Sequence, residues 1–246
     1  MAVESFSTSS IPFGDVTPRR TSRRSHALFE ALQKEIVLGS LHPEQALTEM
    51  DLAQRFACSQ GTVREALMRL AEEGLVNRQP NRGTRVAPCQ ADDARALLHI
   101  RREVECGFLD RVVANADASL ERDLHDRLNA MRNAARDGDE YALSVFDRAF
   151  HGRLFEAADL PLVAPILTRC LIHNHRYKIL NAQPNRELEA TAERHVPILD
   201  ALATRDVAGL QELLSHHIAT IVDFGPDLTR SEEHTSELQS LRHLVC

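Results

Sequence analysis

Residues 48–86 constrain the fold of this chain most, because their apolar side chains follow the spacing of two short helices with a sharp break between them. The break is the run Cys58-Ser59-Gln60-Gly61. Apolar residues recur at helical spacing on both sides of it, at Leu52, Ala53 and Phe56 before it and at Val63, Leu67 and Leu70 after it. Thr48 and Ser59 are the expected N-caps, with Asp51 as the capping-box partner of Thr48. The pattern predicts a helix-turn-helix.

The second of these helices begins with small polar residues and an arginine. In a helix-turn-helix, the start of the second helix enters the major groove of DNA, where such side chains contact base edges and phosphates. We therefore expect DNA contacts from Ser59, Gln60, Thr62 and Arg64, and from Arg69 on the same helix. The alternative is an ordinary helical hairpin with a solvated charged face.

Residues 75–86 contain two short β-prone runs on either side of a turn. No acidic residue occurs between positions 77 and 91. The basic residues on or beside the turn are Arg78, Arg82 and Arg85. We expect a basic wing that contacts phosphates or the minor groove through Asn81, Arg82 and Gly83. Gly83 would also be needed by the turn alone.

These segments resemble the GntR family of bacterial transcription regulators. The shared residues are Ala31-Leu32-Gln33-Lys34-Glu35-Ile36, Gly39-Ser40-Leu41-His42-Pro43, Val63-Arg64-Glu65-Ala66-Leu67, Glu73-Gly74-Leu75-Val76 and Pro80-Asn81-Arg82-Gly83. The family usually carries an arginine after the serine that begins the recognition helix, where this chain has Gln60. The resemblance implies a DNA-binding winged helix, and the replacement implies a changed operator preference. Glutamine can still bind adenine with two hydrogen bonds.

The length and composition fit two domains. A chain of 246 residues with 43% hydrophobic content can bury two cores, and a boundary near residue 90 gives units of ordinary size. We expect a winged helix-turn-helix domain at residues 23–88 and an effector-binding and dimerisation domain at residues 90–228.

The net charge of −7 is unevenly distributed along the chain. Residues 1–89 carry 11 basic and 10 acidic side chains, and the remainder carries 18 and 26. Four arginines lie around the start of the first predicted helix, at Arg19, Arg20, Arg23 and Arg24. They would add salt-dependent affinity for phosphates. Alternatively, residues 1–22, which are rich in Ser, Thr and Pro, form only a disordered basic leader.

The run at residues 230–240 resembles the in-frame translation of a common sequencing adapter. We therefore expect residues 229–246 to be an assembly artefact and assign them no part in the fold or the site.

The N-terminus, the hydropathy and the cysteines indicate the compartment. The N-terminus lacks a charged region followed by an apolar one, and no apolar run approaches 18 residues. The five cysteines form no C-x-x-C pair. These features predict a cytoplasmic protein that does not contact a membrane.

Residues 90–228 show helical periodicity throughout. The predicted helices cover residues 91–116, 120–136, 140–158, 162–181, 187–204 and 207–224. Short connections imply antiparallel neighbours, so the fold class is mainly α: a winged helix-turn-helix followed by an antiparallel bundle of about six helices. The stretch has neither strand–helix alternation nor a Walker or G-x-G-x-x-G motif, and an aromatic content of 4% disfavours RNA recognition by base stacking.

Four polar residues of the bundle occupy positions where apolar ones are expected. Asp147 and His151 share one apolar helix face, whereas His195 and His217 lie on the apolar stripes of two other helices. The neighbouring His216 points toward solvent. Each histidine alone is more readily explained as a hydrogen-bonded core residue. Together with a buried carboxylate, however, they would be satisfied at once by a divalent cation.

The same four residues match the metal motif of FadR-like GntR regulators with an FCD effector domain. That motif is Asp-x-x-x-His, then a His before Ile-Leu-x-Ala-Leu, then a His near the end of the last helix. The resemblance covers about residues 25–228 and implies a divalent metal ion, for which Zn, Ni, Mn and Fe all fit the donor set. Pro197, two residues after His195, either lies in the first turn of its helix or kinks it.

The resemblance also places an arginine in the ligand cavity, at Arg101. A guanidinium suits a small carboxylic-acid effector, although a salt bridge with Glu105 explains this arginine equally well. Asn174, with His173 and Arg176, is a further candidate for the border of that cavity.

The sequence therefore predicts a homodimeric transcription regulator, with repression as the favoured sign of control, rather than an enzyme. Two winged helices would bind a pseudo-palindromic operator on double-stranded DNA, and the effector would favour one arrangement of them. One alternative is a metal-dependent hydrolase or lyase, although no motif places a general base beside the metal. The other is a dedicated metal sensor.

Overall fold

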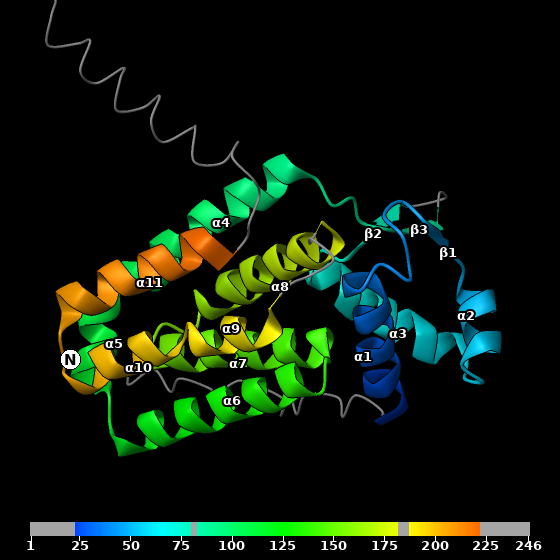
Figure 1. Ribbon diagram of the computed structural model, residues 1–246. Helices are drawn as coiled ribbons and strands as arrows, with labels where there is room; N and C mark the ends of the chain where they lie inside the picture. Colours follow the sequence, from blue (N-terminus) through cyan, green and yellow to red (C-terminus); the bar gives the residue numbers. More distant parts are fainter. Residues whose placement is uncertain (1–22, 80–82, 182–186, 222–246) are drawn as a thin grey trace, which may run out of the picture.

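The computed structural model describes residues 23–79, 83–181 and 187–221, which form two parts in contact with each other (Figure 1). The first, the winged-helix domain, comprises α1 (Arg23–Val37), β1 (Ala46–Leu47), α2 (Glu49–Arg55), α3 (Gln60–Glu72), β2 (Val76–Gln79) and β3 (Gly83–Val86). The second, the helical bundle, comprises α4 (Ala91–Cys106), α5 (Leu109–Asn115), α6 (Ala118–Arg136), α7 (Glu140–Glu156), α8 (Ala164–Leu180), α9 (Leu188–Glu193), α10 (Val196–Ala203) and α11 (Val207–Ile221).

Each helix of the helix-turn-helix begins with the N-cap residue that the sequence predicts. The side chain of Thr48 accepts a hydrogen bond from the backbone N–H of Asp51 at 3.1 Å, and the side chain of Ser59 accepts one from Thr62 at 3.1 Å. Each bond satisfies an N–H group that has no partner inside its own helix. The two predicted N-caps are confirmed.

The wing is an antiparallel sheet in which β3 lies between β1 and β2. Gln79 pairs with Gly83. Pro80, Asn81 and Arg82 of the predicted turn lie outside the described residues. Gly83 has a φ of 79°, a left-handed conformation that a side chain would strain. The return strand of the wing therefore requires a glycine at this position.

The bundle confirms the mainly α fold class, but two of the six predicted helical stretches are interrupted. The first divides into α4 and α5 at Gly107, where a Cβ atom would lie 2.5 Å from the carbonyl oxygen of Glu103. The fifth divides into α9 and α10 at Arg194 and His195. Pro197 lies in the first turn of α10, where its missing N–H costs nothing, so it begins a helix rather than kinking one. Within residues 23–79, 83–181 and 187–221, no helix is long and apolar enough to span a membrane.

Helix α8 packs on both parts of the molecule (Figure 1). Leu167 and Leu171 belong to the apolar core of the bundle, whereas Ile172 belongs to the core of the winged-helix domain. On α7, the hydroxyl of Tyr141 donates a hydrogen bond to Oε1 of Gln33 on α1 at 3.0 Å. The winged-helix domain is therefore docked on the bundle by packed and hydrogen-bonded contacts.

The shared core predicts that a bundle residue stabilises the winged-helix domain. Replacing Ile172, which is 3% exposed, by alanine should lower the free energy of unfolding by about 2–4 kcal/mol through loss of apolar burial and a residual cavity. Chemical denaturation measures the loss, and hydrogen exchange should place faster opening in α3. Ile166→Ala on the same helix is the control, because Ile166 is 49% exposed. Equal losses for the two variants would contradict the shared core.

Candidate metal centre and nucleic-acid interface

The structure brings the four predicted metal ligands together inside the bundle. Asp147 and His151 lie on α7, His195 immediately precedes α10, and His217 lies on α11. All four are buried, and one donor atom of each lies within 4.8 Å of the others. Ligand atoms bound to one metal ion at about 2 Å are roughly 3–4 Å apart, so adjustments of about 1 Å would allow all four to bind one ion.

The ring of His195 is oriented by the backbone. Its Nδ1 lies 3.2 Å from the carbonyl oxygens of Thr191 and Ala192, and because carbonyl oxygens only accept, Nδ1 must carry the proton. In a neutral ring, Nε2 then carries a lone pair. This Nε2 lies 3.3 Å from Oδ1 of Asp147, and neither atom has a hydrogen-bond partner among the described residues.

The ring of His151 is oriented by a carboxylate. Its Nδ1 lies 2.5 Å from Oε2 of Glu105. Burial alone would raise the pKa of Glu105, but Arg101 and His151 lower it to about 2, so the carboxylate accepts and Nδ1 donates. Nε2 of His151 is then free to face Nε2 of His217, at 3.2 Å. Metal-binding histidines commonly donate their other ring N–H to a carboxylate or carbonyl in this way.

The charge states within the cluster also suit a cation. Burial lowers the pKa of His151 and holds the pKa of His217 well below its usual range, so both rings are neutral near pH 7. Burial would raise the pKa of Asp147, but the neighbouring His175 holds it well below its usual range, so Asp147 is ionised. A negative carboxylate surrounded by neutral rings is the donor set that a divalent cation requires.

Two residues that contact this cluster were not predicted as part of it. The sequence predicts Glu105 only as a salt-bridge partner of Arg101 and predicts no role for His175. His175 is buried on α8, with its Nε2 3.0 Å from Oδ2 of Asp147. The sequence did contain a signal, because His175 lies four residues after the core residue Leu171, and so on the same helix face.

Of the two predicted effector residues, Arg101 lies on α4 and Asn174 lies on α8, where it contacts a different part of α4. The Nε of Arg101 donates to Oε1 of Glu105 at 2.5 Å, while Nη1 and Nη2 are buried without a partner among the described residues. Asn174 donates to the carbonyl oxygen of Ala94 at 2.9 Å, and its own Oδ1 has no partner there. Seven residues of helix separate Ala94 from Arg101, about 10 Å along the axis. The structure therefore places Arg101 beside the cluster and Asn174 nearer the winged-helix domain.

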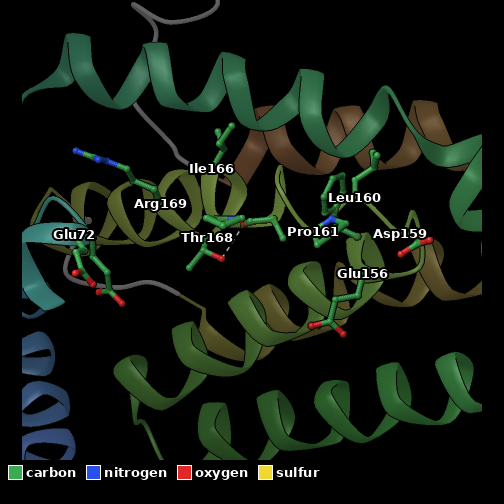
Figure 2. Close-up of a pocket in the computed structure, with 12 residues that line it drawn as sticks. Glu72, Glu156, Asp159, Leu160, Pro161, Ile166, Thr168 and Arg169 are labelled. Carbon is green, nitrogen blue, oxygen red and sulfur yellow. Dashed lines mark hydrogen bonds between the residues drawn. The ribbon is translucent and has the colours of Figure 1, made fainter. Parts of the chain in front are cut away.

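Two cavities border the bundle helices, and the smaller one reaches Asp147. An open groove of about 780 Å³ follows the start of α8 and ends at Glu72 and Arg169 (Figure 2). Most of its lining is apolar, including Phe155, Leu160 and Ile166. A second cavity, of about 10 Å³, is lined by Asp147 and His175 and has room for about one water molecule.

The DNA-contacting residues predicted for the helix-turn-helix lie in two groups along α3 and its N-cap. At its N-terminus, Ser59 and Gln60 are exposed, and the hydroxyl oxygens of Ser59 and Thr62 are 2.9 Å apart. Arg64 pairs with Glu49 through two hydrogen bonds of 3.1 and 2.7 Å. Arg69 lies about two turns later, with its guanidinium 4.0 Å from the centre of the Phe29 ring on α1. Arg69 therefore packs against α1, away from the end of α3 that carries the other candidates.

His175 predicts how stability depends on pH. Burial lowers its pKa to about 4, so between about pH 6.5 and 4 the unfolded chain binds a proton that the folded chain does not. As the pH falls over that range, metal-free protein should therefore lose about 3 kcal/mol of unfolding free energy through this group. His175→Gln should flatten the dependence by nearly one proton, as measured by urea denaturation at several pH values. The exposed His216→Gln is the control, and parallel curves for His175→Gln and the wild type would contradict the assignment.

Comparison with known proteins agrees with this architecture. The sequence pattern of the bacterial regulatory proteins of the gntR family matches residues 24–86, and that of the FCD domain matches residues 96–220. The chain is 32% identical over 202 residues to the uncharacterized HTH-type transcriptional regulator BphR of Paraburkholderia xenovorans, covering 80% of this chain and 82% of BphR.

Two further proteins are similar over most of their length. The probable D-xylose utilization operon transcriptional repressor of Paenarthrobacter nicotinovorans is 28% identical over 207 residues, covering 83% of this chain and 91% of the repressor. The structure of Escherichia coli McbR/YncC superposes with a TM-score of 0.67 at 21% identity, covering 79% of this chain and 93% of McbR, which shows the same fold. The chain is a member of the GntR family of DNA-binding transcriptional regulators, with a C-terminal FCD domain.

Proposed function

We propose that this regulator is a repressor whose FCD domain binds one divalent metal ion through Asp147, His151, His195 and His217. The observation that carries the proposal is the orientation of the His195 ring, whose Nε2 faces Asp147 and has no hydrogen-bond partner among the described residues. His195 and His151 use Nδ1 to donate to acceptors outside the cluster, which leaves each Nε2 lone pair directed at Asp147 or His217. A lone pair facing a carboxylate oxygen is repulsive unless a cation lies between them.

The donor set limits the metal without selecting one. Three imidazole nitrogens and one carboxylate oxygen suit zinc, nickel, manganese or iron. When bound, the ion would neutralise Asp147 and offer coordination positions that the four side chains leave open. Glu105 and the carbonyl oxygens beside His195 would fix the ring orientations.

Arg101 supports a carboxylate effector at the same centre. Its side chain is fully buried, its Nε is held by Glu105, and Nη1 and Nη2 lack partners among the described residues. Leaving two guanidinium nitrogens unpaired in the interior is costly, so a ligand that accepts from both would be favoured. A carboxylate accepts two parallel hydrogen bonds from such a pair. We propose a small carboxylic acid as the effector.

The domain arrangement supports control of DNA binding rather than catalysis. The exposed N-terminus of α3 carries Ser59, Gln60 and Arg64, and the relatives compared above are named as transcriptional regulators or repressors. We propose that the chain acts as a homodimer in the cytoplasm, and that its two winged helices bind the halves of a pseudo-palindromic operator.

The metal site is tested by removing ligands. His195→Ala and His217→Ala should each weaken zinc binding by at least about 100-fold, because each removes one of the four proposed donor atoms. Isothermal titration of chelator-treated protein measures the affinity. His216→Ala, one residue from His217 and exposed, should bind zinc as the wild type does. Wild-type affinity in either ligand variant would refute the assignment.

The nucleic-acid interface is tested with a matched pair of ion-paired arginines. Arg64→Ala should weaken DNA binding across sequences and reduce the slope of log affinity against log salt by about 1, because one phosphate contact is lost. The control is Arg132→Ala, since Arg132 is also exposed and bonded twice to one carboxylate, that of Glu193, but lies in the bundle. Fluorescence anisotropy on a duplex selected by the wild-type protein from a random library gives both quantities. Identical salt slopes for the two variants would argue against a phosphate contact at Arg64.

A further inference from the structure

Four consecutive residues of α8, His173 to Arg176, contact four different parts of the molecule. His175 lies against the metal-ligand candidate Asp147, with 3.0 Å between Nε2 and Oδ2. Asn174 donates to the carbonyl oxygen of Ala94 on α4 at 2.9 Å. His173 and Arg176 contact the winged-helix domain and the segment that joins it to α4, as described next. A single turn of helix thus connects the candidate metal centre to the DNA-binding part of the chain.

The contacts on the winged-helix side are hydrogen bonds to backbone carbonyls. Nε2 of His173 lies 2.9 Å from the carbonyl oxygen of Glu73, the C-cap residue of α3, so this nitrogen donates. Arg176 donates from Nη2 to Ala87 at 2.7 Å and from Nη1 to Pro88 at 3.2 Å. Ala87 and Pro88 lie between β3 and α4, in the connection between the two domains. Arg176 is fully buried, which makes the loss of these acceptors costly.

Close packing leaves little room for α8 to move independently of the winged-helix domain. Ile172 lies in the core of that domain, one residue before His173. At the end of α8, a Cβ atom on Gly39 would lie 2.5 Å from Cδ2 of Leu180, so backbone and side chain are in tight contact there. Because packed interiors transmit displacement rather than absorb it, a shift of α8 would move the end of α3.

We propose that α8 couples the metal centre to the DNA-binding domain, with His175 positioning Asp147 and with His173 and Arg176 holding the end of α3 and the interdomain connection. The proposal rests on the metal site proposed above. A carboxylate oxygen that binds a metal ion lies about 2.0–2.2 Å from it. Drawing Asp147 toward the centre of the cluster would change its contact with His175, and the neighbours of His175 on α8 would carry that change to α3.

A second connection runs through α4, where Glu105 contacts His151 and α4 continues from the same interdomain segment. The two routes differ in what a substitution would disturb. Changing Glu105 would alter a residue that orients a metal ligand, whereas Arg176 and His173 contact none of the four ligand candidates among the described residues. Substitutions at these two positions therefore separate coupling from metal binding.

The test compares two affinities in the full-length chain. Zinc affinity is measured by titration calorimetry after chelation. DNA affinity is measured with zinc and with excess chelator, on a duplex selected by the wild-type protein from a random library, and the ratio of the two dissociation constants gives the coupling. For the wild type we expect a ratio of about 5-fold or more. In Arg176→Gln the ratio should fall to within about 2-fold of unity, while zinc affinity stays within about 3-fold of wild type.

Two further variants make the result decisive. His173→Phe removes one hydrogen bond while preserving bulk, and it should also lower the ratio. It supplies the test if Arg176→Gln folds poorly. Arg205→Gln is the matched control, because Arg205 also donates to two backbone carbonyls, those of Val113 and Ala116, but within the bundle. It should retain the wild-type ratio.

The outcomes separate the two proposals. Wild-type ratios in both Arg176→Gln and His173→Phe would overturn the coupling through α8. A wild-type protein that binds zinc but has the same DNA affinity with and without it would also overturn the coupling, while leaving the metal site intact. A wild-type protein that does not bind zinc, nickel, manganese or iron would overturn the metal site and the coupling together.

Discussion

The arrangement of the bundle depends on one charge, the carboxylate of Asp147, which is buried among histidine rings in an otherwise apolar interior. A buried carboxylate is tolerated only where partners compensate for lost hydration. His175 from α8 contacts one carboxylate oxygen, and His195 from the α9–α10 junction and His217 from α11 belong to the cluster that a bound cation would neutralise. The orientations of the His151 and His195 rings follow from the partners of their Nδ1 atoms, which are Glu105 for His151 and two backbone carbonyls for His195.

Helix α8 connects this centre to the winged-helix domain. It contributes apolar residues to the cores of both domains. Within one helical turn, four consecutive polar residues contact Asp147, α4, the end of α3 and the interdomain connection. The winged-helix domain is thus docked by buried contacts rather than only joined by a linker. In a regulator of this kind, a ligand shifts DNA binding only if it favours one placement of the winged helices over another, and a docked domain can have discrete placements.

Local signals in the sequence were sufficient for much of this structure. The caps Thr48 and Ser59 and the glycine of the wing follow from short-range chemistry, and the interior placement of His195 and His217 follows from helical periodicity. The breaks at Gly107 and at residues 194–195 were harder, because periodicity continues across a short interruption. His175 and Glu105 were missed as members of the cluster for a different reason. Each satisfies the periodicity of its own helix, and what it contacts is decided by packing between distant helices. The separation of Arg101 from Asn174 is likewise set by helix packing.

The most direct test of the account is the coordination shell of the bound ion. X-ray absorption spectroscopy of the zinc-loaded full-length protein should show nitrogen and oxygen donors at about 2.0–2.1 Å, with the multiple-scattering pattern of about three imidazoles and no sulfur. A sulfur shell near 2.3 Å, or scattering from fewer than two imidazoles, would show that the buried aspartate and its histidines do not form the metal centre.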